Sequence, residues 1–228
     1  MNQDTLDYYN RNAHQIADSY EIQRPHRLYE LISLFFKTAD HITLDLGCGS
    51  GQDAAHLKSK DYKVIGLDAS EEMIREAKIR HPGIEFRNGS LPALSDLMDA
   101  CVDNLLCSGV FMHLGEEDLI PAAINCRRVM KEQGVLILTF RDNDSNSSQS
   151  PGDTRLFTII SPGRLAMLFE SLGMRVLYQE MANDLTGRGH QWQTLIVQNT
   201  MTPFSDGIAR IRGTDCKERV RTLKNRKL

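Results

Sequence analysis

The chain has 228 residues, of which 41% are hydrophobic and 25% charged, and its net charge is −3. This length suits one α/β domain with additions, and the charge balance excludes a strong overall attraction to nucleic acid. Because no apolar run approaches the ~18 residues of a membrane span, and residues 1–4 lack the layout of a signal peptide, we expect a cytoplasmic protein with no membrane partner.

Two helices are predicted before the first strand. Apolar residues and tyrosines recur at a spacing near 3.6 over residues 3–20, and a second amphipathic stretch covers residues 26–37. A buried charged ligand needs polar partners, and the tyrosines could equally be packing residues with wet hydroxyls. Three side chains in residues 1–38 are candidate partners: Tyr9, Tyr20 and Arg24.

A glycine-rich turn follows the first predicted strand, residues 42–46. Its sequence is Gly47-Cys48-Gly49-Ser50-Gly51, and a helical pattern comes next. Such a turn lets the backbone approach a ligand closely and directs helix N-terminal N–H groups at it. A dinucleotide fingerprint needs its third glycine at position 52, which is Gln52, and no Lys-Ser or Lys-Thr pair follows for a phosphate loop.

An acid, Asp45, stands two residues before the first glycine. With Gly47, Gly49 and Gly51 it resembles motif I, (D/E)-x-G-x-G-x-G, of the class I S-adenosylmethionine-dependent methyltransferases. The resemblance implies that the turn, including Cys48, wraps the methionine and ribose parts of the cofactor, and that the acid contacts its amino group directly or through water. Alone, the three glycines leave an ordinary ligand-free turn open.

A second apolar run, residues 62–68, ends in another acid, Asp68. A carboxylate at the end of the second strand of a βαβ unit accepts hydrogen bonds from ribose hydroxyls. The alternative role, a helix N-cap, is better filled by Ser70. The neighbouring Ala69 and Met73 are predicted to contact the cofactor as well.

The third predicted strand, residues 84–87, leads into Asn88, Gly89 and Ser90. Many members of the family carry an acid near this position that touches the adenine amino group, so the resemblance implies adenine contact here. Asn88 departs from the acid but can hydrogen-bond through its amide. A plain Asn-Gly turn is the alternative.

The fourth predicted strand, residues 101–107, runs into a segment that resembles motif IV of the family. The main chain of Cys107, Ser108 and Gly109 is predicted to line the cofactor pocket, because open α/β sheets bind ligands at this edge. His113 is the only titratable side chain in the segment. It could take a proton from a nucleophilic acceptor or serve only in capping or packing.

A helix over residues 116–132 and a turn over residues 130–134 precede the fifth strand, residues 135–140. The fifth strand is a continuous apolar run, as expected when both faces are covered. A polar loop, residues 142–153, follows between Arg141 and Arg155. Guanidinium groups beside a substrate mouth favour a carboxylate or phosphate, although such arginines are often simply solvated.

A helix over residues 162–172 and two strands, residues 174–179 and 192–198, complete the pattern. The short connection between the two strands favours an antiparallel pair. The resemblance therefore implies a doubly wound, Rossmann-like sheet of seven strands, mostly parallel with an antiparallel last strand, and helices on both faces.

The tail, residues 207–228, holds eight Lys or Arg and two acidic residues. Basic tails can contact nucleic acid, but this one has no aromatic residues for base stacking, so nucleic acid is the less favoured partner. The five cysteines of the chain show no metal-ligand spacing, and no metal is expected. Nothing in the sequence indicates the oligomeric state.

In the family that the sequence resembles, an N-terminal helical extension often forms a lid over the cofactor. The resemblance therefore implies a helical lid (1–38) and an S-adenosylmethionine-binding methyltransferase domain (39–200), followed by a basic tail (201–228). The predicted reaction transfers the methyl group of S-adenosylmethionine to a small-molecule acceptor by direct displacement and leaves S-adenosylhomocysteine. Two alternatives stay open: an RNA, DNA or protein methyltransferase that uses the tail, and a non-catalytic regulatory protein that binds S-adenosylmethionine. No Asn/Asp-Pro-Pro-Tyr segment follows the fourth strand, which counts against a nucleic-acid enzyme.

Overall fold

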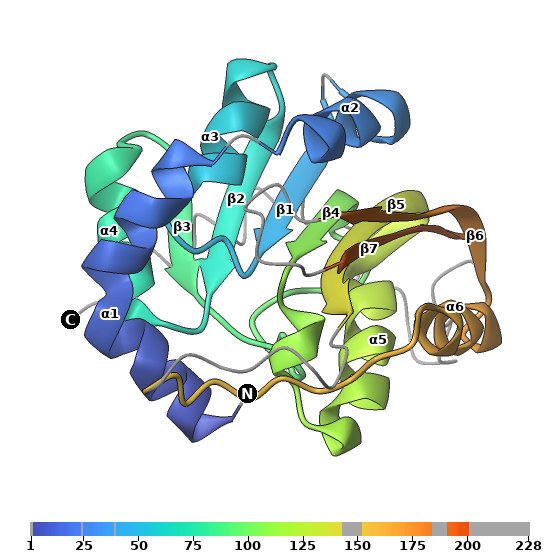
Figure 1. Ribbon diagram of the computed structural model, residues 1–228. Helices are drawn as coiled ribbons and strands as arrows, with labels where there is room; N and C mark the ends of the chain where they lie inside the picture. Colours follow the sequence, from blue (N-terminus) through green and yellow to red (C-terminus); the bar gives the residue numbers. More distant parts are fainter. Residues whose placement is uncertain (1, 24, 39, 143–151, 184–190, 201–228) are drawn as a thin grey trace.

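The computed structural model describes residues 2–23, 25–38, 40–142, 152–183 and 191–200 (Figure 1). Its strands form one seven-stranded sheet in the order β3-β2-β1-β4-β5-β7-β6. The first five strands are parallel: β1 (Ile42–Leu46), β2 (Lys63–Asp68), β3 (Glu85–Asn88), β4 (Val102–Ser108) and β5 (Met130–Asp142). β7 (Gln191–Asn199) pairs antiparallel with both β5 and β6 (Met174–Asn183), so it alone runs opposite to the other strands. The predicted sheet is confirmed.

Helices cover both faces of this sheet (Figure 1). The α-helices of the described residues are α1 (Gln3–Ile22), α2 (His26–Phe35), α3 (Gln52–Ser59), α4 (Glu71–Arg80), α5 (Leu119–Val129) and α6 (Pro162–Ser171). Two 3₁₀ turns, Phe111–His113 and Glu116–Asp118, precede α5. Helices α5 and α6 pack on one face, whereas α2, α3 and α4 pack on the other.

The central strands are apolar on both faces because both faces are covered. On β4, Leu105 packs with the α5 and α6 side, whereas the next residue, Leu106, packs with α2. On β5, Leu136 and Ile137 divide in the same way. This alternation follows from the two-residue side-chain period of a strand, and it accounts for the uninterrupted apolar run in the sequence.

The predicted boundary between α5 and β5 was wrong. The sequence indicated a helix to residue 132 and a turn over residues 130–134, but the helix ends at Val129 and β5 begins at Met130. The amide of Asn199 donates to the carbonyl of Met130 at 3.1 Å, and Gln133 adopts a left-handed φ of 61°. The residues of the expected turn therefore form an irregular part of β5. The hydrogen bond from Asn199 of β7 stabilises it.

Helix α1 lies along α4, at the edge of the sheet where the parallel strands end (Figure 1). Its small side chains Ala13 and Ala17 are buried against Met73 of α4. The strand order reverses between β1 and β4, so the crevice for a ligand is expected at this edge. The fold thus places α1 over the expected site.

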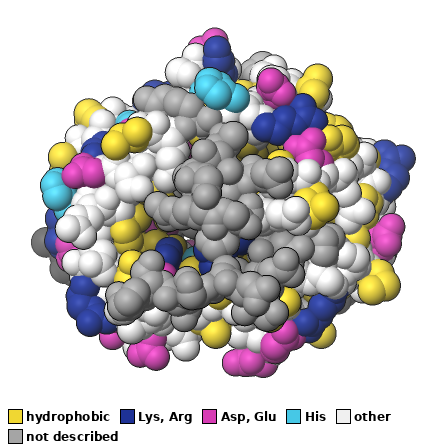
Figure 2. All heavy atoms as spheres, in the orientation of Figure 1, with side chains coloured by type: hydrophobic (Ala, Val, Ile, Leu, Met, Phe, Trp, Pro, Cys, Tyr) yellow, Lys and Arg dark blue, Asp and Glu magenta, His cyan; other side chains and the backbone are white. Residues whose placement is uncertain are grey.

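On the face shown in Figure 2, acidic, basic and hydrophobic side chains of the described residues are interspersed. No helix within the described ranges is long and apolar enough to cross a membrane. The basic tail lies outside the described residues.

Gly66 of β2 provides a test of the packing under α3 and α4. A Cβ at this position would lie 2.5 Å from Cδ1 of Phe86 and 3.0 Å from Sγ of Cys48. We expect Gly66→Ala to lower the free energy of unfolding by about 1–3 kcal/mol, because the buried ring must shift. Denaturant titration measures the change. Gly163→Ala is the control: nothing lies within 4 Å of its Cβ position in α6, so it should stabilise by about 0.5–1 kcal/mol.

Candidate active site

A cavity of about 570 Å³ opens at the carboxyl edge of the parallel strands. Its walls come from the turn after β1, the ends of β2 and β4, helix α1 and the β5–β7–β6 part of the sheet. Fourteen sequence-predicted site residues line it: Tyr9, Tyr20, Gly47, Cys48, Gly49, Asp68, Ala69, Gly89, Ser90, Ser108, Gly109, His113, Arg141 and Arg155. The fold brings these residues together from positions as far apart as the two ends of the domain.

The turn after β1 is shaped by its glycines. Gly47 and Gly49 have left-handed φ values of 75° and 52°, and a Cβ on Gly47 would lie 2.2 Å from Cγ2 of Val110. The N–H groups of Gly47 and Cys48 both donate to the carbonyl of Leu67, at 2.7 and 2.9 Å. A side chain on Gly47 would overlap Val110, so glycine is needed here, and the backbone of this turn, the glycine cradle, stays bare where it lines the cavity.

Gly51 serves packing rather than the cavity lining. Its φ is 84°, and a Cβ there would lie 2.6 Å from Cζ of Phe86. Phe86 therefore sets the requirement for glycine at the third position of the motif.

Asp68 fastens this turn to the next one. Its Oδ2 accepts the N–H of Gly49 at 2.9 Å, and its Oδ1 accepts the N–H of Ser70 at 2.8 Å. Burial raises the pKa of Asp68, and the backbone donors counteract part of that rise. Ser70 caps α4 by accepting from the N–H of Met73, so the cap is where the sequence predicted it and Asp68 faces the cavity.

Asn88 makes its contacts with the protein backbone. Its Nδ2 donates to the carbonyls of Asp68 and Ala69, at 3.2 and 2.9 Å. It does not line the cavity, although the following Gly89 and Ser90 do. The amide thus braces the end of β2, and its predicted adenine contact remains a prediction.

Two more carboxylates surround the glycine turn. Asp45 lies behind it, 2% exposed, and among the described residues its Oδ2 has no hydrogen-bond partner. Burial, reinforced by the charges of Asp53 and Asp68, raises the pKa of Asp45 well above its usual value. Asp53 lines the cavity from the first turn of α3. Burial raises the pKa of Asp53 to about 6, against the opposing hydrogen bond from the Tyr29 hydroxyl at 3.0 Å.

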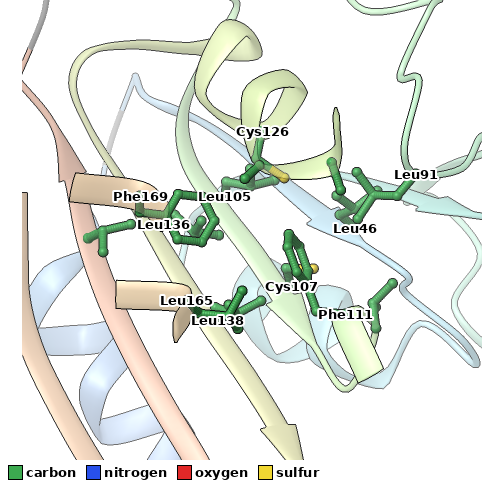
Figure 3. Close-up of a cluster of buried hydrophobic side chains, with 14 of the residues drawn as sticks. Leu46, Leu91, Leu105, Cys107, Phe111, Cys126, Leu136, Leu138, Leu165 and Phe169 are labelled. Carbon is green, nitrogen blue, oxygen red and sulfur yellow. The ribbon is translucent and has the colours of Figure 1, made fainter. Parts of the chain in front are cut away.

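Two other predicted residues, Met73 and Cys107, are not among the residues that line the cavity. Met73 is 1% exposed and packs under α1. The side chain of Cys107 points into the core on the α5 side, near Phe111 (Figure 3), and burial raises the pKa of its thiol. Arg24 is outside the described residues. Their predicted cofactor contacts remain predictions.

His113 is buried, and its hydrogen bonds fix its tautomer. Its Nδ1 lies 2.7 Å from the carbonyl oxygen of Leu156, which can only accept, so Nδ1 carries the proton. Nε2 therefore offers a lone pair, and the Tyr9 hydroxyl, 3.1 Å away, donates to it. Burial lowers the pKa of His113 to about 4, and the nearby Arg155 and Arg141 contribute to the shift. The imidazole is thus a neutral base at physiological pH.

The two arginines predicted at the substrate mouth have different surroundings. Arg155 donates to both oxygens of Asp153, at 2.9 and 2.7 Å, and lies 3.4 Å from the Tyr9 hydroxyl. Burial lowers the pKa of Arg155, but its bonds to Asp153 and Tyr9 outweigh burial and raise it overall. The guanidinium of Arg141 stacks on the ring of Phe157, with Cζ 4.2 Å from the centroid.

Backbone contacts join the α1 side of the cavity to the segment that carries Arg155. The N–H of Leu156 donates to Oγ1 of Thr5 at 2.7 Å, and Oγ1 of Thr154 donates to the carbonyl of Asp4 at 3.3 Å. Near the other end of α1, Ser50 Oγ donates to Glu21 at 2.9 Å. Helix α1 is therefore bonded to both sides of the cavity.

Sequence reasoning missed several residues of the lining. Asp53 carried a usable signal, since an acid in the first turn of the helix after the glycine turn is placed near its positive N-terminus. Other missed residues depend on tertiary contacts and strand register, which the local sequence does not reveal: Arg27, Thr139, Phe157, Glu180, Ala182, Trp192 and Thr194. Among the described residues, no group of three His, Cys, Asp or Glu side chains could hold a metal ion.

Comparison with known proteins agrees with this geometry. Residues 44–138 match the family model described as a methyltransferase domain. A "probable S-adenosylmethionine-dependent methyltransferase" of Mycolicibacterium smegmatis is 28% identical over 164 residues, which cover 70% of this chain and 61% of that protein. A trans-aconitate 2-methyltransferase of Paracidovorax citrulli is 27% identical over 132 residues, or 57% and 50% of the two chains. The chain thus spans less than two thirds of the length of these curated relatives.

A solved structure shows the same fold. The 1,6-didemethyltoxoflavin-N1-methyltransferase of Burkholderia thailandensis, with bound 1,6-didemethyltoxoflavin and S-adenosylhomocysteine, superposes with a TM-score of 0.69 at 16% identity. The match covers 87% of this chain and 88% of that one. The sheet order and the glycine turn therefore define a Rossmann-like methyltransferase fold. Residues 44–138 form a class I S-adenosylmethionine-dependent methyltransferase domain, as the sequence resemblance indicated.

Asp53 predicts how cofactor preference changes with pH. Because its pKa is about 6, the carboxylate is mostly neutral at about pH 5 and mostly charged at about pH 7.5. S-adenosylmethionine carries one more positive charge than S-adenosylhomocysteine, so its relative affinity should rise over this range by about fivefold, or ~1 kcal/mol. Calorimetry with both compounds measures the ratio. In Asp53→Asn the rise should become smaller, because only the raised pKa values of Asp68 and Asp45 are left to contribute, and an unchanged rise in that variant would contradict the assignment.

Proposed function

We propose that the protein transfers the methyl group of S-adenosylmethionine to a small-molecule acceptor, and that S-adenosylhomocysteine is the second product. The observation that carries this proposal is that one cavity joins the glycine cradle and Asp68 to a neutral His113. The cofactor, when bound, supplies a methyl carbon activated by its sulfonium. The protein then needs to bind and orient the reactants and to accept a proton.

The cofactor half of the cavity fits a dipolar, cationic nucleoside. The glycine turn offers backbone without side chains, and Asp68 and Asp53 supply carboxylates to the same wall. Gly89, Ser90, Ser108 and Gly109 complete this half. The residues present therefore fit S-adenosylmethionine, and we assign them to its binding together with Cys48 and Ala69.

Helix α1 is assigned the role of a lid. Tyr9 and Tyr20 line the cavity from this helix, and the ring of Tyr20 lies against Gly49, 3.2 Å from its Cβ position. The hydroxyl of Ser70 donates to Asn10 at 2.6 Å. Because these contacts span the cofactor half, α1 excludes water from a bound ligand and must move to admit one.

Tyr9 and His113 form the proton-accepting pair. The Tyr9 hydroxyl donates to Nε2 of His113 and faces the cavity. A proton leaving the acceptor nucleophile passes to the oxygen of Tyr9 as the hydroxyl proton passes to Nε2. The proton on Nδ1 stays in place because the carbonyl of Leu156 holds it.

A small acceptor is supported by the size and enclosure of the site. A cavity of about 570 Å³ is within the range of small-molecule sites. The Paracidovorax relative is named for trans-aconitate, and the Burkholderia structure holds 1,6-didemethyltoxoflavin. The direct test is incubation of the protein with methyl-labelled S-adenosylmethionine and fractionated metabolites. Label transferred to a metabolite is expected, whereas label found only in protein or RNA would contradict a small acceptor.

Asp68→Ala tests the cofactor half. We expect it to weaken binding of S-adenosylhomocysteine by about 1–2 kcal/mol, because a charge-assisted hydrogen bond is lost and the glycine turn loosens. Calorimetry measures the affinity. The control is Asp96→Ala, which removes an exposed carboxylate outside the cavity and should leave affinity unchanged. Equal affinities in the two variants would refute the role of Asp68.

His113→Asn tests the base. The amide can still donate to the Leu156 carbonyl but lacks the Nε2 lone pair. We expect turnover to fall by about 10²–10⁴-fold with affinity for S-adenosylhomocysteine unchanged. Since the pKa of His113 lies near 4, below its ordinary ~6.5, the wild type should keep its basic form as pH falls from 7 to 5. Turnover that survives in His113→Asn would exclude His113 as the base.

A further inference from the structure

Beyond the cofactor half, the cavity is floored by the antiparallel part of the sheet. Directly paired residues on neighbouring antiparallel strands place their side chains on one face, as do residues i and i+2 of a strand. The register of β5, β7 and β6 therefore builds two rows of three side chains on one face. The rows are Thr139, Thr194 and Glu180, and Arg141, Trp192 and Ala182. All of them line the cavity, and we name this surface the platform.

The platform begins where β4 ends. Oγ of Ser108, the last residue of β4, and Oγ1 of Thr139 lie 2.9 Å apart. The Trp192 indole also lies near the end of β4: Cη2 of Trp192 is 3.6 Å from the position that a Cβ on Gly109 would take. The indole is partly exposed to the cavity. A flat molecule on Trp192 would thus lie next to the strand end at which the cofactor half begins.

The two ends of the cavity carry opposite charge. The carboxylates of Asp53 and Asp68 line the cofactor half. Three guanidinium groups line the platform end: Arg27, Arg141 and Arg155. Nε and Nη2 of Arg27 lie within 3.0 Å of the Glu180 carboxylate, and Arg155 is paired with Asp153. Nη1 of Arg27 also donates to Glu30 at 3.0 Å. The Arg141 guanidinium, stacked on Phe157, lines the cavity beside Trp192 and is therefore placed to meet an anion there.

We propose that the methyl acceptor is a planar aromatic carboxylate that stacks on Trp192 and directs its acid group to Arg141; this rests on the function proposed above. Arg141 and Trp192 are direct cross-strand partners, so one molecule can meet both. Stacking on Phe157 holds the guanidinium in place. Thr139 and Thr194, the neighbouring pair on the same two strands, present hydroxyls to ring substituents.

Trp192 is the only tryptophan of the chain, so its fluorescence reports on the platform alone. We would titrate the full-length protein, saturated with S-adenosylhomocysteine, with 4-nitrobenzoate. The matched probes are 4-nitrobenzyl alcohol, which keeps the ring without the charge, and cyclohexanecarboxylate, which keeps the charge without the flat ring. We expect saturable quenching of the Trp192 fluorescence by 4-nitrobenzoate. The other two probes should bind at least about tenfold more weakly. Binding of cyclohexanecarboxylate is measured by its displacement of 4-nitrobenzoate.

Variants locate the contacts. Arg141→Gln should weaken the binding of 4-nitrobenzoate about tenfold, because a charge-assisted hydrogen bond is lost. The affinity for 4-nitrobenzyl alcohol should be unchanged. Trp192→Leu, followed by calorimetry, should weaken both nitro compounds. The control is Arg175→Gln, which alters an exposed arginine of β6 outside the cavity and should change neither. Affinity for S-adenosylhomocysteine reports whether each variant is folded.

The outcomes separate the two proposals. If S-adenosylhomocysteine binds but 4-nitrobenzoate shows no preference over the alcohol, or Arg141→Gln binds it as the wild type does, the acceptor class is overturned and the proposed function stands. If S-adenosylhomocysteine does not bind the wild type, both are overturned.

Discussion

The carboxylate of Asp68 connects the two turns from which the cofactor half is built. It ends β2 and accepts one N–H from the turn after β1 and one from the start of α4. Bonds to a charged acceptor are strong in a partly dehydrated site, so the turn keeps its shape without a ligand. Asn88 adds a second brace by donating to the carbonyls of the same segment. The cavity is therefore preformed, and binding need not order the backbone of its floor.

A separation of charge follows from the same architecture. The carboxylates of Asp68 and Asp53 come from the end of β2 and from α3, whereas the guanidinium groups come from α2, from β5 and from the segment before α6. Of the strands involved, β2 lies on one side of the point at which the strand order reverses, and β5 lies on the other. A cationic donor and an anionic acceptor would each be drawn to their own side, so electrostatics favours the orientation in which they face one another.

The parts of the site that sequence could predict are those whose geometry is local. The glycine turn, Asp68 and the Ser70 cap all follow from strand, turn and helix signals within a few residues. The cap is confirmed, and Asp68 lines the cavity beside the glycine turn, whereas their cofactor contacts stay predictions. Asp153, the partner of Arg155, is also close in sequence. The local sequence does not, however, distinguish an arginine paired in this way from one that is solvated. The sequence indicates a packing role for Trp192, and only the register of β5 and β7 shows that it lies beside Arg141. The tautomer of His113 depends on a carbonyl 43 positions away, which no periodicity reports.

The bond between Thr5 and the N–H of Leu156 gives α1 a second consequence besides enclosure. The same Leu156 holds the imidazole through its carbonyl, and α1 supplies the tyrosine on the other ring nitrogen. If α1 acts as the proposed lid, opening would remove the hydroxyl neighbour of the histidine and the anchor of the residue that orients it. Proton acceptance by the proposed base would then be confined to the closed form, and attack by solvent on an exposed sulfonium would go unassisted.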